Sequence, residues 1–168
     1  MAGLYFFDSG ELAIRTSAHS ALDGFFWLLN PLAGTLRIRS MTFQSQAATK
    51  TEAAAATRIS LERMTFTGTP TGSIYEICKG NSTMPVPAFQ IVQSSSGIIP
   101  QAGPRWMSFF CFIVMTGGGG AAPFMHFWFS PNGRNIELLP GEGVVCRQAD
   151  AGVTNETRVC SVGMLVEE

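Results

Sequence analysis

The sequence has few charged residues and no long hydrophobic run. Only 14% of its 168 residues are charged, and 11 basic against 12 acidic side chains leave a net charge of -1. A balanced chain of this kind does not attract a nucleic-acid backbone, so we expect no nucleic-acid partner. No apolar run approaches the roughly 18 residues of a membrane helix, and the N-terminus lacks the cationic start of an export signal. We therefore expect neither a membrane span nor a cleaved leader.

Reactive side chains are scarce. No cysteine lies in a C-x-x-C pair, so we expect buried free thiols rather than a zinc or redox site. His19 and His126 are the only histidines, and no H-x-H motif is present. We expect His19 in a loop and His126 buried in the core or at an interface. The four cysteines are Cys78, Cys111, Cys146 and Cys160.

Motifs of known enzyme classes are also missing. The chain has no Gly-x-Ser-x-Gly elbow, and the glycines at 117–120 lack the lysine and helix of a phosphate-binding loop. We interpret them as a hairpin or a loop. Glu62 with Glu76, and Glu137 with Glu142, are interpreted as solvated carboxylates rather than acid–base pairs. The sequence thus predicts a protein that is not an enzyme, with no catalytic residue, cofactor or metal.

Two segments show the period of a half-buried strand. Residues 35–43 alternate apolar and polar side chains with one slip near Ser40, and residues 57–66 do so with a slip at Met64. We predict that these two strands are neighbours in one sheet. Residues 44–56 between them have no apolar face and are predicted to form an exposed loop or a short surface helix.

The rest of the chain also consists of short predicted strands separated by turns and loops. Residues 80–105 are rich in proline and glycine, so we predict mostly connection there, with an edge strand at 89–92. Many short strands separated by turns, with almost no helical period, predict one all-β domain over 1–168: an antiparallel β-sandwich of the jelly-roll type with long loops. The further predicted strands are 73–79, 109–115, 124–129, 135–139, 144–148 and 157–166.

The N-terminal residues allow two interpretations. Leu4, Tyr5, Phe6 and Phe7 are apolar but have no periodic partner nearby. They form either an arm over 1–10 that anchors the chain to a partner, or the first core strand. We include all four among the candidate interface residues.

Other aromatic and basic residues add to this partner surface. Trp27 and Trp128 lie inside apolar runs and are predicted to be core residues, whereas Trp106 beside Arg105 is the one predicted exposed platform. Arginine outnumbers lysine nine to two, and its planar guanidinium suits interface hydrogen bonding. Arg105 and Trp106 complete the candidate interface.

Two segments resemble those of a known family. Residues 28–39 (LLNPLAGTLRIR) resemble a Leu-x-Asn-Pro-x-(Ala/Ser)-Gly turn that leads into a strand, and residues 138–148 (LLPGEGVVCRQ) resemble a Leu-x-Pro-Gly-Glu-Gly hairpin. Both are similar to segments of small jelly-roll decoration, or cement, proteins on tailed-phage capsids. The resemblance implies a homotrimer at three-fold positions of the capsid lattice, made in the host cytoplasm and bound to the major capsid protein on the outer surface of the virion.

The expected function is therefore structural. Bound across several capsid subunits, such a protein stabilises the assembled head. The alternative is a carbohydrate- or receptor-binding β-sandwich module of a phage tail or fibre, and an enzyme of the cupin type comes third. Copy number in the particle distinguishes the first two, and a bound metal would favour the third.

Overall fold

The computed structural model describes residues 3–20, 23–31, 34–47, 56–112, 124–128, 136–151 and 158–168, without the side chains of 45–47, 56, 104–112, 124, 128 and 158. In this part of the chain every regular element is a strand. The strands are β1 (Leu4–Asp8), β2 (Leu12–Ala13), β3 (Phe26–Asn30), β4 (Leu36–Ala47), β5 (Ala56–Gly68), β6 (Cys78–Lys79), β7 (Gln90–Val92), β8 (Ile98–Phe112), β9 (Phe124–Trp128), β10 (Ile136–Leu138), β11 (Glu142–Gln148) and β12 (Arg158–Glu167).

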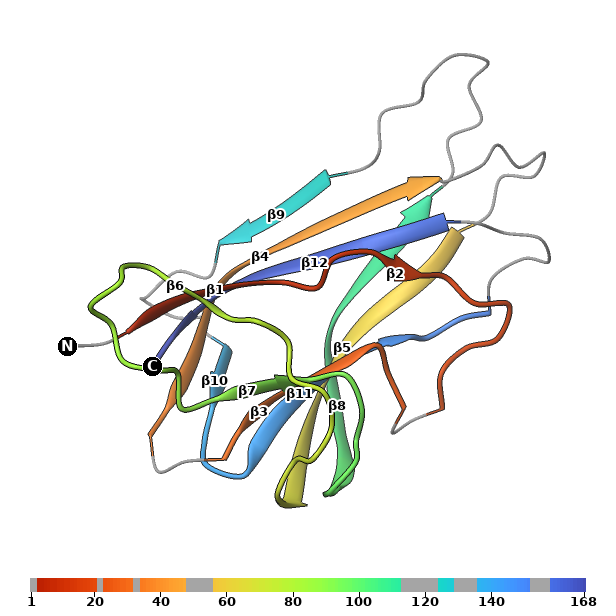
Figure 1. The fold of residues 1–168 in the computed structure, drawn as a ribbon. Helices are drawn as coiled ribbons and strands as arrows, with labels where there is room; N and C mark the ends of the chain where they lie inside the picture. The colour runs from red at the N-terminus through yellow and green to blue at the C-terminus, as the bar shows by residue number, and fades with distance from the viewer. Residues whose placement is uncertain are drawn as a thin grey trace.

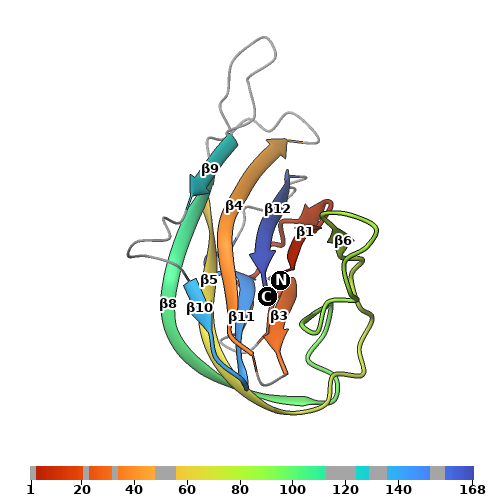
Figure 2. The ribbon, with the colours of Figure 1, turned by 90° about the vertical axis from the view of Figure 1, so that its left-hand side faces the viewer.

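The strands form two antiparallel sheets that pack face to face (Figures 1 and 2). One has seven strands, with the order β10-β4-β12-β1-β6, and β2 and β9 pair with β12 and β4. The other has five, with the order β7-β3-β11-β5-β8. The main hydrophobic core lies between them, because Met41 and Val162 of the first sheet cluster with Leu28 and Leu61 of the second. The predicted all-β antiparallel sandwich is confirmed.

The two alternating segments are strands, but they are not neighbours. β4 pairs with β12, β9 and β10, whereas β5 lies in the other sheet between β11 and β8. The predicted pairing is therefore wrong. Both slips in the pattern coincide with β-bulges: the register shifts opposite Ser40 in β4 and between Glu62 and Met64 in β5. β4 also extends to Ala47, beyond the predicted start of the loop, and residues 48–55 lie outside the described part.

The proline-rich stretch contains more strand than predicted. β7 is the predicted edge strand, but β8 begins at Ile98 and includes Pro100 and Pro104. β8 is the outer strand of its sheet, where a residue without an N–H is tolerated. The strand predicted at 73–79 is reduced to the two residues of β6 and a single bridge from Ile74.

Of the two interpretations of the glycine run, a hairpin or a loop, the hairpin is wrong, because the strands on either side belong to different sheets. β8 pairs with β5, whereas β9 pairs with β4. The glycines themselves, at 117–120, lie outside the described residues.

The N-terminal segment is the first core strand. β1 pairs with β12 along its whole length, and Tyr5 and Phe7 are 0% and 4% exposed in the core. The arm interpretation is therefore wrong for these two residues. Leu4 and Phe6 point to the opposite face and are exposed, because successive strand residues alternate.

Candidate partner-binding face

The outer face of the seven-stranded sheet carries a row of residues that crosses four strands. Asp8 of β1 is opposite Gly163 of β12, Gly163 is opposite Thr42 of β4, and Thr42 is opposite His126 of β9. Directly opposite positions in antiparallel strands share a face. Because Asp8 and His126 are exposed, the row faces away from the core.

A hollow of about 400 Å³ opens over this row. Gly163 is part of its lining, and a side chain at this position would collide with Thr42 Oγ1. Phe6 borders it with 48% of its surface exposed. A sheet face in contact with water alone is normally polar, so this apolar lining is typical of a surface that a partner covers. The hollow is lined by Phe6, Phe7, Asp8, Ser40, Thr42, Cys78, His126, Gly163, Met164 and Leu165.

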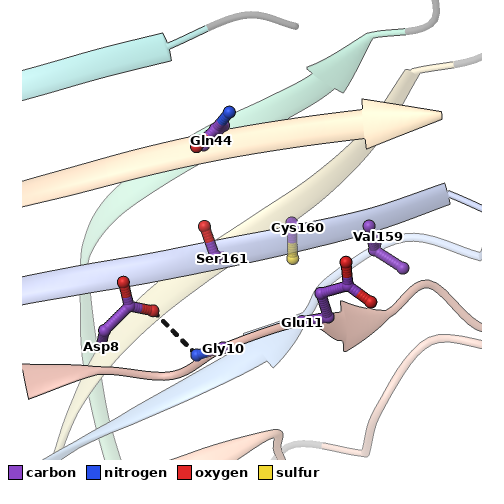
Figure 3. A pocket seen from close by; sticks show the side chains of 7 residues that line it. All are labelled: Asp8, Gly10, Glu11, Gln44, Val159, Cys160 and Ser161. Carbon is purple, nitrogen blue, oxygen red and sulfur yellow. Dashed lines mark hydrogen bonds between the residues drawn. The ribbon is translucent and has the colours of Figure 1, made fainter. Parts of the chain in front are cut away.

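A second hollow of about 230 Å³ has a more polar lining than the first and shares Asp8 with it (Figure 3). β1 leaves the sheet at Ser9, whose Oγ accepts a hydrogen bond of 2.9 Å from the N–H of Val162. Gly10 then turns the chain with φ of 63°, and its N–H donates to Asp8 Oδ1 at 2.8 Å. The turn places Asp8 and Glu11 on either side of Gly10. The lining is Asp8, Gly10, Glu11, Gln44, Val159, Cys160 and Ser161.

Asp8 and Glu11 have no ion-pair partner within the described residues, whereas most of the described carboxylates do. All six arginines with described side chains pair within the chain, so these arginines stabilise the fold rather than forming the partner surface that the composition favoured. The pairs are Arg15–Asp23, Arg37–Glu137, Arg39–Glu167, Arg58–Asp150, Arg63–Glu142 and Arg147–Glu62.

Of the predicted interface residues, Leu4 and Phe6 remain available to a partner because they lie on this outer face. The other two apolar residues of β1 are in the core. Arg105 and Trp106 lie in β8 of the other sheet, and their side chains fall outside the described part. The structure therefore does not bring the six predicted residues together on one surface.

Several predicted environments differ from those in the structure. His126 is exposed, which excludes the core and leaves the interface as its predicted environment, and Cys78 is exposed rather than buried. Cys146 and Cys160 are buried free thiols, as predicted, and the Cys111 side chain is outside the described part. Within the described residues, no group of three or more histidine, cysteine or acidic side chains is arranged to hold a metal ion.

Two carboxylates predicted to be solvated are structural. Glu62 is buried and accepts hydrogen bonds from Arg147 Nε at 2.8 Å and from Ser60 Oγ at 2.9 Å. Burial by itself raises the pKa of Glu142. Hydrogen bonds from Arg63 and from the Leu139 N–H have the larger, opposite effect, so the pKa lies below its usual value. These groups bind neighbouring strands and are not free acids or bases.

The two segments that carry the family resemblance meet at one corner of the sandwich. Asn30, in residues 28–39, donates from Nδ2 to the carbonyl of Leu138 at 2.8 Å, at the start of residues 138–148. In return the N–H of Gly141 donates to the Asn30 carbonyl at 2.9 Å. We call this the Asn30 corner. It joins turns that are far apart in the sequence into one hydrogen-bonded unit.

Comparison of the chain with protein-family models, with curated proteins and with solved structures finds no match in any of the three. Among the described residues, no helix has the length and hydropathy needed to cross a membrane. A functional assignment therefore depends on the sequence resemblance and on the geometry of the outer face.

Proposed function

We propose that this chain is a structural protein of a tailed-phage virion, a decoration protein that binds the outer surface of the head and stabilises it. The Asn30 corner carries the proposal. Two turn motifs that match by chance need not be neighbours in space, whereas these two share direct hydrogen bonds. The strand order is also consistent with the jelly-roll that the resemblance implies.

The outer face of the seven-stranded sheet is the surface we assign to the capsid. An apolar centre with a polar rim is the usual anatomy of a protein interface. Here the centre is the hollow beside Phe6, and Asp8 and Glu11 lie at the rim without a cation among the described residues. A capsid surface that complements this face presents an apolar side chain next to a lysine or arginine.

The proposed mechanism is mechanical. A ligand that binds only the folded, assembled state stabilises that state by mass action. A homotrimer on a three-fold position engages several major capsid subunits at once, which multiplies the effect of each weak contact. No chemical step is required.

One observation favours a second candidate function. The second hollow is lined by the side chains of Gln44, Ser161 and the two carboxylates, and through Asp8 it adjoins the hollow that the exposed Phe6 ring lines. An aromatic ring beside hydrogen-bonding groups is a chemistry that binds sugars. The alternative is therefore a carbohydrate- or receptor-binding module of a phage tail or fibre.

Quantitative mass spectrometry of purified particles from the source of this sequence tests the proposal by counting copies of the chain per major capsid subunit. A ratio typical of a lattice-wide component supports a decoration protein. A few copies per particle would favour the tail or fibre alternative, and absence from the particle would refute both.

A binding assay then tests the assigned face. We expect Phe6→Ala to weaken co-sedimentation with heads that lack the protein about tenfold or more, because buried aromatic anchors dominate interfaces. Ile99→Ala is the matched control, since Ile99 is also exposed but lies on β8 of the other sheet. Equal binding by the two variants would mean that another surface contacts the capsid.

A further inference from the structure

Residues 14–20, which we call the strap, cross from one sheet to the other (Figure 1). They follow β2, where Leu12 pairs with Cys160 of β12 in the seven-stranded sheet. Near their end lies His19, whose N–H donates to the carbonyl of Gln148 in β11 of the five-stranded sheet, at 2.9 Å. The strap thus connects the two sheets near the end of β11.

The buried side chain of Gln148 holds the start of the strap. Its Oε1 accepts from the N–H of Arg15 at 2.9 Å, and its Nε2 donates to the Arg15 carbonyl at 2.7 Å. Nε2 also donates to the carbonyl of Asp150 at 2.8 Å. The side-chain amide of Gln148 therefore satisfies both backbone groups of Arg15, as the backbone of a neighbouring strand would in a sheet.

The imidazole of His19 holds the other end, and its geometry fixes its charge. The N–H of Gln148 donates to His19 Nδ1 at 2.9 Å. A backbone N–H can only donate, so Nδ1 carries no proton and the ring is neutral, with its proton on Nε2. The ring packs edge-on against Phe25, with 4.5 Å between centroids, and it is only 5% exposed.

The surroundings of the ring disfavour a positive charge. Burial is the largest cause that lowers the pKa of His19, and Arg15 and Arg147 lower it further, whereas Asp23 raises it. Asp23 also forms an ion pair with Arg15, with 3.9 Å between Oδ2 and Nη1, and Arg147 forms an ion pair with Glu62. His19 Nε2 has no hydrogen-bond acceptor among the described residues, so in this part of the chain the attraction of Asp23 is the one effect that favours the imidazolium, and burial outweighs it.

We infer that His19 is a pH-sensitive latch: the neutral ring closes the strap over the end of β11, and protonation opens it. A proton on Nδ1 turns the acceptor that the Gln148 N–H uses into a second donor. The ring must then leave its site to reach water. Its departure also removes the bond of 3.2 Å from Arg147 Nη1 to the His19 carbonyl, so the strap loosens as a unit. This inference does not depend on the virion proposal.

The sign of the effect follows from linkage. The open state takes up a proton near the ordinary histidine pKa of 6.5, and the closed state only at lower pH. Opening is therefore independent of pH above about 6.5. Below that value the opening constant rises by up to about tenfold per pH unit until the closed-state pKa is reached.

Amide hydrogen exchange followed by NMR between pH 8 and pH 5 tests the latch in the whole chain. After correction for intrinsic exchange rates, we expect the opening constants of the Gln148 amide and of the strap amides to rise together below pH 6.5. His19→Asn keeps an acceptor near the Nδ1 position but does not titrate, so its opening constant should not change with pH. His126→Asn, in the other histidine of the chain, should keep the wild-type pH dependence.

A flat wild-type profile would overturn the latch, as would a His19→Asn variant that keeps the wild-type slope. Should His19→Asn fail to fold, an NMR titration of the wild-type histidine rings decides instead. Strap opening that follows the protonation of the His19 ring supports the latch, and opening that follows the His126 ring refutes it.

Discussion

The outer faces of the two sheets differ in what covers them. All five residues of β3 in the five-stranded sheet are buried: Phe26 and Leu28 belong to the main core, whereas Trp27 and Leu29 belong to a second hydrophobic cluster on the opposite face. On the seven-stranded sheet, Phe6 points outward and stays about half exposed. The second cluster consists of Trp27, Leu29, Met64, Phe66, Val92, Ile98 and Val145.

This difference shows that apolar residues on an outer face have two uses. Those of the five-stranded sheet are buried within the chain itself and contribute to folding. Those around Phe6 are still in contact with water, so their burial can stabilise only a complex with a partner. The face that a partner can use is the one that the chain leaves uncovered.

Truncation of one aromatic residue from each outer face tests this comparison most directly. Trp27 is 2% exposed, so Trp27→Ala should lower the free energy of unfolding by about 3–5 kcal/mol. Phe6→Ala should lower it by less than about 1 kcal/mol, because the ring is already half in water. Urea denaturation measures both, and equal losses would contradict the difference between the faces.

Breaking an ion pair should also cost more stability on the covered face than on the open face. Glu62 lies opposite Val145 on the covered face, and its pair with Arg147 is largely buried, so Glu62→Gln leaves a buried guanidinium and should cost about 3 kcal/mol. The pair between Arg37 and Glu137 on the open face is exposed, so Glu137→Gln should leave stability unchanged. The thermal midpoints of the two variants check this. A comparable drop in both would show that burial on the covered face does not make its ion pair more important for stability.

The Asn30 corner joins the two sheets, because Asn30 is in β3 and Leu138 is in β10. Asn30→Ala removes the donor to two carbonyls, those of Gly34 and Leu138, and should cost about 1–3 kcal/mol. Denaturant unfolding measures the loss. Asn81→Ala is the control, since Asn81 accepts similar bonds in an exposed turn, and a loss as large there would mean that burial at the corner contributes little.

The smallest expected effect is on the loss of stability at acidic pH. The folded-state pKa of Glu142 lies below its usual value of 4.5, so its contribution to stability is complete above about pH 4.5 and is lost as the pH falls through the folded-state value. Glu142→Gln should make stability less dependent on pH below 4.5. Denaturant midpoints between pH 3 and pH 6 check this, and unchanged pH dependence in the variant would exclude Glu142 as the cause.

Local features of the fold could be predicted from the sequence, but long-range ones could not. The alternation around Ser40 indicated the strand, and the one slip in it falls where the structure has a bulge, because a bulge shifts the period of two by one residue. The same pattern occurs in β5, and nothing in it specifies which sheet a strand joins. The continuous apolar run of β3 gave no alternation at all, because both of its faces are buried.

The site shows a similar limit. The apolar character of Phe6 was visible in the sequence, but its exposure depends on the register of β1 against β12. His19 lies in the short segment Ser17-Ala18-His19-Ser20, which gave no signal of burial, since its acceptor role depends on Gln148, a residue far along the chain. Glu62 likewise occupies what the sequence shows as an ordinary polar position of a strand, whereas in the structure it is buried and paired with Arg147 of the neighbouring strand β11.

The prolines in β8 have a consequence for behaviour at high concentration. The outer strand of a sheet is a template on which another chain can add a strand, and this is how many β-proteins begin to aggregate. Pro100 and Pro104 have no N–H to offer an incoming strand. The first half of this edge is therefore a poor site for chain-to-chain growth, which helps molecules crowded side by side to stay separate.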